Sequence, residues 1–297
     1  MRVFVTGATG FIGSAVVKEL IAGGHQVLGL CRSEAKAAAL AAAGAEVYGG
    51  SLEDLDRLRS GAARSDGVIH LAFNHDFSNF AANGEADRRV IQALGSVLAG
   101  DRRPLVVTSV IPMVKTAPGQ PAREDNATFG FDVIPRASEE AAAAVAAEGG
   151  NVSVVRLPQV HDTVKQGLVT QAIGLFREKG VCAYVGDGQN RWPAAHVLDV
   201  ARLYRLALEK AEPDAKYHAV AEEGVPLRAI AEALGRRLEL PARSIAPGEA
   251  QAFFGWMARF AGHDMPASSE QTRRKLGWEP AGPGLLADLE QLHVPEN

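Results

Sequence analysis

Cysteines and long apolar runs are scarce in this 297-residue sequence, and each absence excludes a class of protein. The two cysteines, Cys31 and Cys182, provide neither a disulfide framework nor the ligand spacing of a metal site, so we expect two buried side chains and no metal. No stretch of about twenty apolar residues could span a membrane. The first apolar strand is expected to begin at residue 2, which leaves no place for a signal peptide before it. We therefore expect a cytoplasmic protein.

A strong excess of either charge is also missing. The sequence has 31 lysines and arginines against 35 aspartates and glutamates, and this net charge of −4 argues against a nucleic acid or an anionic membrane as partner. Its 22% of charged and 47% of hydrophobic residues are ordinary for a globular enzyme, and its length can bury an ample core. The expected partner is a small-molecule substrate, with no nucleic acid and no membrane.

The first thirty residues carry the clearest pattern. A short apolar strand at 2–6 is followed by a glycine turn, a helix at 15–21 and a second strand at 26–31, which is the context of a dinucleotide-binding turn. The turn holds Gly7, Gly10 and Gly13. In such a motif the first glycine permits the tight turn, the second lets backbone approach a pyrophosphate, and the third lets the helix pack closely on the strand.

The end of the second strand favours NADP over NAD. An NAD-binding fold usually places an acidic residue about twenty residues after the glycines, where it holds the ribose hydroxyls. Cys31 stands at that place here, and Arg32 follows it. Because arginine can bind a 2′-phosphate and stack on adenine, we expect NADP to be the preferred cofactor.

The rest of the chain alternates apolar strands with helical stretches. Strands are expected at 45–48, 66–73, 104–109 and 151–156, with helices such as 85–98 and 138–148 between them. This alternation predicts an α/β fold with a doubly wound parallel sheet of the Rossmann type. We expect residues 1–160, completed by about 191–220, to form an NADP-binding domain. Residues 161–190 and 221–297 are expected to form a smaller C-terminal substrate-binding domain.

Several segments resemble the extended short-chain dehydrogenase/reductase superfamily, in particular its NAD-dependent epimerase/dehydratase type. Thr6-Gly-Ala-Thr-Gly-Phe-Ile-Gly13 is similar to the fingerprint of that superfamily, and Lys275-Leu-Gly-Trp-Glu-Pro280 is similar to its C-terminal turn. Other similar segments are Gly49-Gly-Ser-Leu-Glu-Asp54, Arg156-Leu-Pro-Gln-Val-His161 and Gly186-Asp-Gly-Gln-Asn-Arg-Trp-Pro193. The resemblance therefore runs the length of the chain.

The resemblance implies both a cofactor site and a substrate site. The implied cofactor-binding residues are Gly7, Thr9, Gly10, Phe11, Ile12, Gly13, Arg32, Ser33, Ser51, Leu52, Leu71, Ala72, Phe73, Thr108, Leu157, Pro158 and Val160. Ser51 stands where the superfamily has an acid that contacts adenine. The expected substrate-binding residues are His75, after the fourth strand, and Asn190, Arg191 and Trp192, in the segment that lines the superfamily's substrate pocket. Arg191 is the strongest substrate candidate.

The catalytic pair of the superfamily is missing. Its Tyr-x-x-x-Lys motif uses the tyrosine to exchange a proton with the substrate oxygen and the lysine to lower the tyrosine pKa. In this sequence Pro135 occupies the tyrosine position and Glu139 the lysine position. No tyrosine occurs from residue 49 to 183 and no lysine from residue 116 to 164, so a shift of register cannot restore the pair. We expect Glu139 to point toward the cofactor ribose.

Three functions are compatible with these residues. The first is an NADP-dependent oxidoreductase acting on a small carbonyl or hydroxyl compound, with Thr108, Ser109 or His161 as an unorthodox proton donor. The second is an NADP-binding sensor without turnover, and the third is a non-redox epimerase or lyase. The retained segment 186–193 favours an enzyme, whereas the missing pair favours a sensor. A homodimer is left open, since members of the superfamily often pair through helices beside the fourth and fifth strands.

Overall fold

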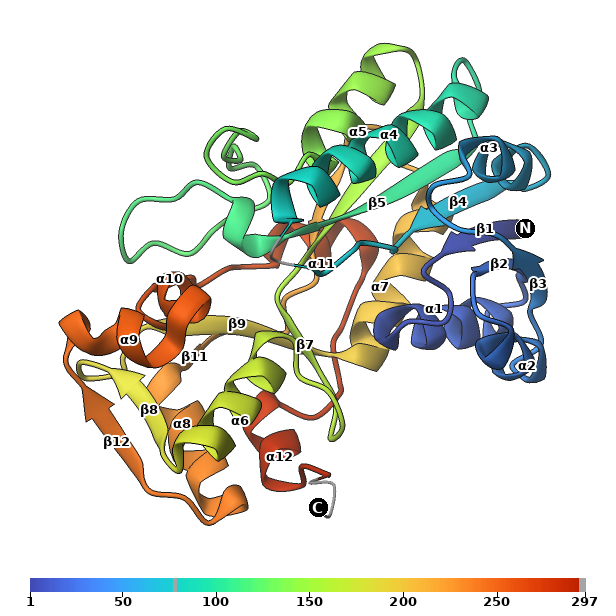
Figure 1. The fold of residues 1–297 in the computed structure, drawn as a ribbon. Coiled ribbons are helices and arrows are strands. Elements are labelled where there is room, and N and C mark those ends of the chain that lie inside the picture. The colour runs from blue at the N-terminus through green and yellow to red at the C-terminus, as the bar shows by residue number, and fades with distance from the viewer. Residues whose placement is uncertain (77–78, 294–297) are drawn as a thin grey trace.

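A seven-stranded parallel sheet forms the larger part of the molecule (Figure 1). The computed structural model describes residues 1–76 and 79–293. The strand order is β10-β6-β5-β4-β1-β2-β3, and every neighbouring pair is parallel. The strands are β1 (Arg2–Thr6), β2 (Gln26–Cys31), β3 (Glu46–Gly49), β4 (Gly67–His70), β5 (Pro104–Val110), β6 (Asn151–Leu157) and β10 (Lys216–His218). The predicted doubly wound parallel sheet is confirmed, and its order reverses between β1 and β4, where ligands bind in such folds.

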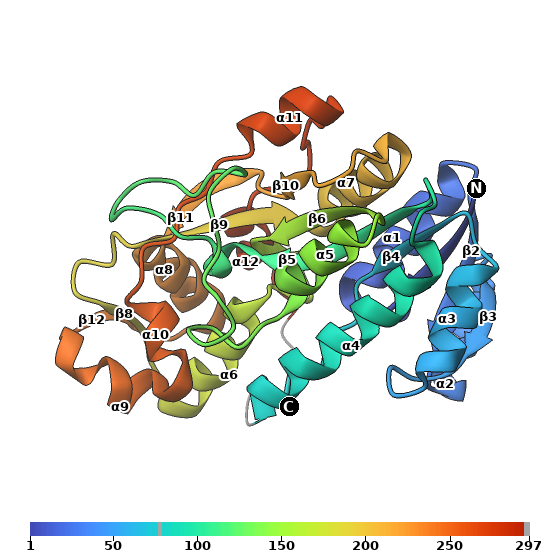
Figure 2. The ribbon, with the colours of Figure 1, turned by 90° about the horizontal axis from the view of Figure 1, so that it is seen from above.

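Helices cover both faces of this sheet (Figures 1 and 2). On one face lie α1 (Phe11–Ala22), α2 (Glu34–Ala42) and α7 (Val197–Lys210), and on the other lie α3 (Leu55–Ala63), α4 (Phe80–Leu98) and α5 (Ser138–Ala147). Alternate residues of β1 enter the two cores, since Val3 and Val5 pack with α1 and α7, whereas Phe4 packs with α3 and α4. The buried strands are therefore apolar on both faces, as a covered parallel sheet requires.

A further hydrophobic core lies at the carboxyl end of the sheet, in the lower left of Figure 1. It is built around a three-stranded sheet, β11-β9-β7, and a two-stranded sheet, β12-β8. These strands are β7 (Gln159–His161), β8 (Cys182–Val185), β9 (Arg191–His196), β11 (Glu222–Pro226) and β12 (Ala242–Ile245). The later helices are α6 (Leu168–Lys179), α8 (Leu227–Leu238), α9 (Ala250–Phe254), α10 (Ala258–Ala261), α11 (Glu270–Leu276) and α12 (Leu285–Glu290).

Two smaller expectations can be compared with the structure. Cys31 and Cys182 are buried free thiols, as predicted, and burial raises the pKa of Cys182 to about 11. Helix α4 begins at Phe80 rather than at the predicted Glu85, because the polar residues that suggested a loop fold into the first turns. Asn83, for example, is buried and donates to the carbonyl oxygen of Asp76. Within residues 1–76 and 79–293, no helix is long and apolar enough to cross a membrane.

Candidate functional site

The glycine turn joins the end of β1 to the start of α1. Gly7 has a φ of +69°, in the left-handed region that favours glycine. A Cβ atom at Gly13 would lie 1.9 Å from the carbonyl oxygen of Gly7, so a side chain at position 13 would force the turn apart. Gly10 is the N-cap of α1 and provides no side-chain cap, so the N-terminal N–H groups of the helix are left for a ligand. The turn thus has the form of a pyrophosphate-binding site.

The segment after β4 packs directly on this turn. The backbone N–H of Ala72 donates to Thr6 Oγ1 over 3.3 Å, and a Cβ atom at Gly7 would lie 2.8 Å from the Ala72 nitrogen. The structure therefore brings Leu71, Ala72 and Phe73 to the glycine turn. Thr9 lies in the turn itself. Phe11 and Ile12 are the first two residues of α1, and they pack against the core on this face of the sheet. That core contains Leu157 and Val160, and Pro158 follows Leu157 in the chain.

Residues beyond β2 and β3 gather on the side expected to hold adenosine. The buried Cys31 thiol donates to the carbonyl oxygen of Ser33, which leaves Arg32 and Ser33 exposed beyond the strand. A hydrogen bond from Ser51 and the charge of Arg32 hold the pKa of Glu53 below its usual range. Ser51 and Arg32 thus both act on Glu53, and Leu52 packs against the core below. Glu53 is an acid that the sequence reasoning did not include in this site.

Thr108 and Ser109, near the end of β5, have different surroundings. Thr108 Oγ1 donates to the carbonyl oxygen of His70 over 2.7 Å and pairs with the Tyr204 hydroxyl over 2.7 Å. Ser109 is 1% exposed, and its hydroxyl has no partner among the described residues. Tyr204 cannot replace the missing catalytic tyrosine, because its buried hydroxyl is bonded to Thr108 and burial raises its pKa.

A buried chain of polar side chains runs beneath these strand ends. Thr6 Oγ1 lies 2.7 Å from His70 Nδ1, His70 Nε2 lies 3.0 Å from Asp87, and the Ser138 hydroxyl donates to Asp87 over 2.6 Å. Burial favours a raised pKa for Asp87, but the hydrogen bond and charge of His70, with Arg136 and Ser138, outweigh it and lower that pKa. The chain links β1, β4, α4 and α5 into one rigid support.

Pro135 and Glu139, predicted to stand at the positions of the catalytic pair, have distinct surroundings. Glu139 accepts two hydrogen bonds of 2.9 Å from Arg156, a residue of β6 that is 0% exposed. The described contacts of Glu139 are with Arg156, and the buried guanidinium needs this carboxylate as its counter-ion. That Glu139 points toward the ribose stays a prediction. Pro135 precedes α5, and its carbonyl packs closely on Gly84 of α4. A Cβ atom at Gly84 would lie 2.3 Å from the carbonyl oxygen of Pro135.

Arg136 is a site residue that the sequence reasoning missed. Its side chain is 7% exposed, and its guanidinium carbon lies 4.1 Å from the centre of the Phe73 ring. Nη2 donates to the carbonyl oxygen of Thr108 over 3.4 Å, while Nε has no partner among the described residues. One signal was available, since Arg136 is the only lysine or arginine from residue 124 to 155. A search restricted to tyrosine and lysine does not find it.

Two further groups lie near Arg136. The His75 ring meets the Phe73 ring edge-on, with centres 5.3 Å apart. Partial desolvation lowers the pKa of His75, and the charges of Arg136 and Lys165 lower it further. Lys165 belongs to the loop after β7, and its Nζ lies 5.9 Å from the centre of the Phe11 ring at the glycine turn. The structure therefore gathers His75, Phe73, Arg136 and Lys165 beside the expected nicotinamide site.

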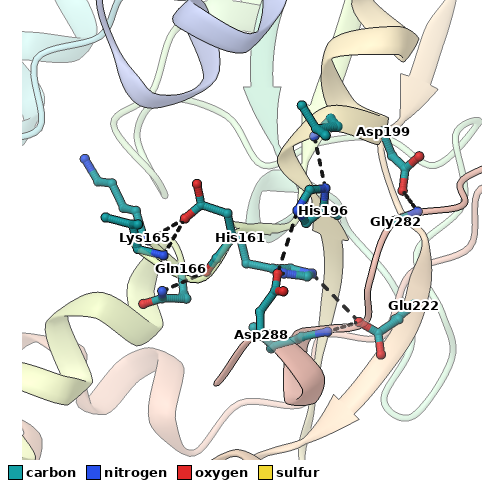
Figure 3. A network of polar contacts seen from close by, with 12 residues as sticks. His161, Lys165, Gln166, His196, Asp199, Glu222, Gly282 and Asp288 are labelled. Carbon is teal, nitrogen blue, oxygen red and sulfur yellow. Dashed lines mark hydrogen bonds and ion pairs between the residues drawn. The ribbon is translucent and has the colours of Figure 1, made fainter. Parts of the chain in front are cut away.

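His161 lies in a different network, shown in Figure 3. Its ring is 0% exposed, Nδ1 donates to Asp288 over 2.6 Å, and Nε2 lies 3.9 Å from Glu222. The ring of His196 lies 5.8 Å away. Burial lowers the pKa of His161, and the two carboxylates only partly oppose it. The described contacts of His161 thus join β7 to β9, β11 and α12, and do not include Thr108 or Ser109.

Three of the four residues expected to bind substrate, Asn190, Arg191 and Trp192, contact residues 260–264 of the chain itself. Arg191 donates to Asp264 through Nε and Nη2, over 3.0 and 2.8 Å, and these bonds raise its pKa. The Asn190 amide donates to the carbonyl oxygen of Ala261 over 3.0 Å. Trp192 is 2% exposed and donates to the carbonyl oxygen of Phe260. The structure brings the three together, with their polar groups bound to this segment. Among the described residues, no three histidine, cysteine or acidic side chains are placed to hold a metal ion.

Known proteins resemble the chain over almost its whole length. The sequence profile of the NAD dependent epimerase/dehydratase family matches residues 3–221. An uncharacterised protein of Schizosaccharomyces pombe is 45% identical over 97% of this chain and 98% of its own. A 4-hydroxy-2-methyl-3-oxo-4-farnesyl-3,4-dihydroquinoline-1-oxide ketoreductase of Stigmatella aurantiaca is 26% identical over 94% of this chain and 92% of its own.

A solved structure shares the fold. The dTDP-glucose 4,6-dehydratase DesIV of Streptomyces venezuelae, solved with NAD and TYD bound, aligns with a TM-score of 0.78 over 98% of this chain and 96% of its own. At 20% sequence identity, this likeness concerns the fold alone.

Proposed function

Because this chain belongs to the NAD dependent epimerase/dehydratase family, within the extended short-chain dehydrogenases and reductases, we propose that it is an NADP(H)-dependent oxidoreductase acting on a small carbonyl or hydroxyl compound. Membership of the family implies a nicotinamide cofactor. The choice of NADP, the substrate class and the proton route are the parts that we propose. The observation that carries the proposal is the glycine turn, which excludes side chains at positions 7 and 13 and leaves the start of α1 uncapped.

The residues around the turn fit a dinucleotide. The N–H groups at the start of α1 would bind the pyrophosphate, and Leu71 to Phe73 would line the path toward the nicotinamide. Arg32 would bind the 2′-phosphate, since the position before it is a buried cysteine and not an acid. When bound, the cofactor supplies a hydride at the nicotinamide. Residues 161–190 and 221–297 would provide the substrate-facing part of the molecule.

Ser109 is the proton donor that the surroundings favour. The Thr108 hydroxyl is already bonded to the His70 carbonyl and to Tyr204. The His161 imidazole is bonded to Asp288 through Nδ1, and its Nε2 has no hydrogen bond among the described residues but faces Glu222 at 3.9 Å, in the network of β9, β11 and α12. The Ser109 hydroxyl is buried without a partner among the described residues, so it has a hydrogen bond to offer to a substrate oxygen. A ketoreductase among the relatives is in keeping with carbonyl reduction, without identifying the carbonyl compound.

A sensor that binds NADP(H) without turnover is the second candidate function. It is favoured by the pairing of Glu139 with Arg156, which gives the position of the superfamily's catalytic lysine a structural contact. A non-redox epimerase or lyase would have the same fold and would equally lack the tyrosine and lysine of the superfamily.

One experiment separates these functions. NADPH binding is measured by calorimetry, and NADPH consumption is followed with a panel of small aldehydes, ketones and oxo acids, for the parent and for Ser109→Ala. The oxidoreductase proposal expects turnover with at least one compound and at least a tenfold lower kcat in Ser109→Ala at unchanged NADPH affinity. Tight NADPH binding without turnover favours the sensor, and no NADPH binding contradicts both.

A further inference from the structure

Among the described residues, Arg136 has no carboxylate paired with its charge and one N–H donor without a partner. Its guanidinium is buried, Nε has no partner among the described residues, and Nη2 makes only a 3.4 Å bond. Asp87, the acid that acts on it most strongly, uses one oxygen for His70 and the other for Ser138. No carboxylate of the described residues forms an ion pair with Arg136, although a buried charge without a counter-ion is costly. Such a group fits a site that a ligand completes.

The guanidinium is held in one place. The guanidinium carbon of Arg136 lies 4.1 Å from the centre of the Phe73 ring, and its Nη2 is bonded to the Thr108 carbonyl near the end of β5. Phe73 itself follows the residues that pack on the glycine turn. Arg136 is therefore fixed beside the carboxyl ends of β4 and β5, where ligands of doubly wound sheets bind. A donor fixed in advance loses little entropy when a ligand binds.

A second cation acts on the same histidine as Arg136. Lys165 and Arg136 both act on His75 through their charges, from the loop after β7 and from the residues before α5. Lys165 extends away from His161 in Figure 3, and its described ring contact is with Phe11 at the glycine turn. The site thus carries two positive charges, and a negative charge on the ligand would stabilise both.

We propose that Arg136 binds a carboxylate of the substrate, with Lys165 and His75 lining the same site. The substrates would then be small carbonyl or hydroxyl compounds that carry a carboxylate. A carboxylate fits better than a lone carbonyl oxygen, because its two oxygens can accept two parallel hydrogen bonds from the planar guanidinium. This proposal rests on the proposed function for the reaction, but not for the binding of the anion.

The test titrates oxalate, a small planar dicarboxylate, and oxamide, its neutral counterpart of the same shape, into cofactor-free and NADP-saturated protein by calorimetry. The variants are Arg136→Met, which keeps most of the length of the side chain, and Arg136→Lys, which keeps the charge but cannot donate two parallel hydrogen bonds from a planar guanidinium. The matched control is Arg103→Met at the opposite end of β5, where the guanidinium donates to the carbonyl oxygens of Ser65 and Val97. Melting temperatures show whether each variant is folded.

Oxalate should bind the parent at least tenfold more tightly than oxamide. This preference should vanish in Arg136→Met, be weakened in Arg136→Lys and persist in Arg103→Met, with NADPH affinity unchanged in both Arg136 variants. Equal binding of oxalate and oxamide by the parent, or an unchanged preference in a folded Arg136 variant, would overturn the proposal. A loss of NADPH affinity in both Arg136 variants would overturn it too, by assigning the anion to the cofactor's phosphates. Arginine-dependent oxalate binding in a protein that does not bind NADPH would contradict the proposed function and keep the anion site.

Discussion

The carboxyl ends of β5 and β6 each have a buried arginine beside them, and the two arginines differ in their partners. Arg156 donates through Nε and Nη2 to Glu139 and through Nη1 to the Glu124 carbonyl oxygen and to His218. Within residues 1–76 and 79–293, Arg136 has one long bond to a carbonyl oxygen, no partner for Nε and no ion pair with a carboxylate. The guanidinium of Arg156 is therefore compensated by a carboxylate, and that of Arg136 is held in position without one from this part of the chain.

The difference shows how one short segment was divided between structure and function. Residues 135–139, which the sequence resemblance predicts to stand at the place of the superfamily's catalytic pair, supply Glu139 to the ion pair at β6 and Arg136 to the proposed site at β5. Complete pairing indicates a structural role, because removing either partner leaves a buried charge. Incomplete pairing beside a cofactor turn indicates a ligand. Each prediction below tests one side of this contrast.

The largest effect should follow from breaking the pair at β6. Glu139→Ala would leave the Arg156 guanidinium buried and uncompensated, and should lower the free energy of unfolding by about 3–5 kcal/mol in urea denaturation. The neighbouring Glu140 is the matched control, because its carboxylate is 41% exposed and pairs with Arg88 at the surface. Glu140→Ala should cost about 1 kcal/mol or less. Similar losses in the two variants would contradict a structural role for the buried pair.

The next largest effect concerns the glycine turn, which belongs to the proposed ligand site, as Arg136 does, and not to the Arg156–Glu139 pair. Gly10 has an ordinary φ of −81°, and a Cβ atom there would meet only the Gly7 carbonyl oxygen, at 3.2 Å. Gly10→Val should therefore fold, while its branched side chain occupies the place of the pyrophosphate. NADPH affinity should fall at least a hundredfold, about 2.7 kcal/mol, as measured by calorimetry. Gly174→Val, at an open position in α6, should leave the affinity unchanged. Retained affinity in Gly10→Val would make the turn a packing feature only.

A pH-dependent loss of stability should arise from the β6 side. Burial, followed by the charge of Arg156, lowers the pKa of His218 from 6.5 to about 3. Its Nδ1 faces the Ser268 carbonyl oxygen and its Nε2 faces Arg156, so the folded protein holds a neutral ring. The unfolded chain takes up a proton below pH 6.5, and the folded chain does so only near pH 3. The contribution is therefore present above pH 6.5 and is lost as the pH falls toward 3.

Unfolding in urea at pH 6.5 and pH 5 measures this loss. One such histidine should lower the free energy of unfolding by about 2 kcal/mol between these pH values. His161, whose pKa is also lowered by burial, adds a loss of the same sign. His218→Gln should have a shallower dependence on pH than the parent, and an identical dependence would show that the ring is already charged in the folded protein.

The sequence predicted what is local. The glycine turn, the strand that precedes it and the missing acid at Cys31 are read within about thirty residues, because spacing alone places a strand, a tight turn and a helix N-terminus in order. The parallel sheet followed from the alternation of strands and helices, since such units wind in one direction. These predictions needed no knowledge of distant contacts.

The contacts that assign roles are distant in sequence. The partner of Glu139 is 17 residues away and that of Arg191 is 73 residues away, so neither pairing could be read from spacing. His161 seemed a free imidazole at a strand end because its partner, Asp288, is 127 residues further along the chain. Arg136 was missed for the opposite reason, since it is defined by a lack of partners, which only the packed structure shows.

The smallest effect should appear at the adenosine side, where Arg32 is shared between a protein acid and the proposed 2′-phosphate. The parent should bind NADPH at least tenfold more tightly than NADH, about 1.4 kcal/mol, and Arg32→Ala should remove most of that preference.

A variant of Glu53 makes this test more specific, because the pKa of Glu53 is lowered by a hydrogen bond from Ser51 and by the charge of Arg32. Glu53→Gln would release Arg32 from an exposed carboxylate, and such surface interactions are weak, so NADPH affinity should rise only about two- to fourfold. NADH affinity should stay constant, and added salt should reduce the gain. Calorimetry of both cofactors at low and high salt measures the NADPH affinity, the NADH affinity and the effect of salt on the gain. Equal affinities of the parent for NADPH and NADH would reject the assignment of Arg32, whereas a gain for both cofactors in Glu53→Gln would mean that Glu53 repels the pyrophosphate and does not compete for Arg32.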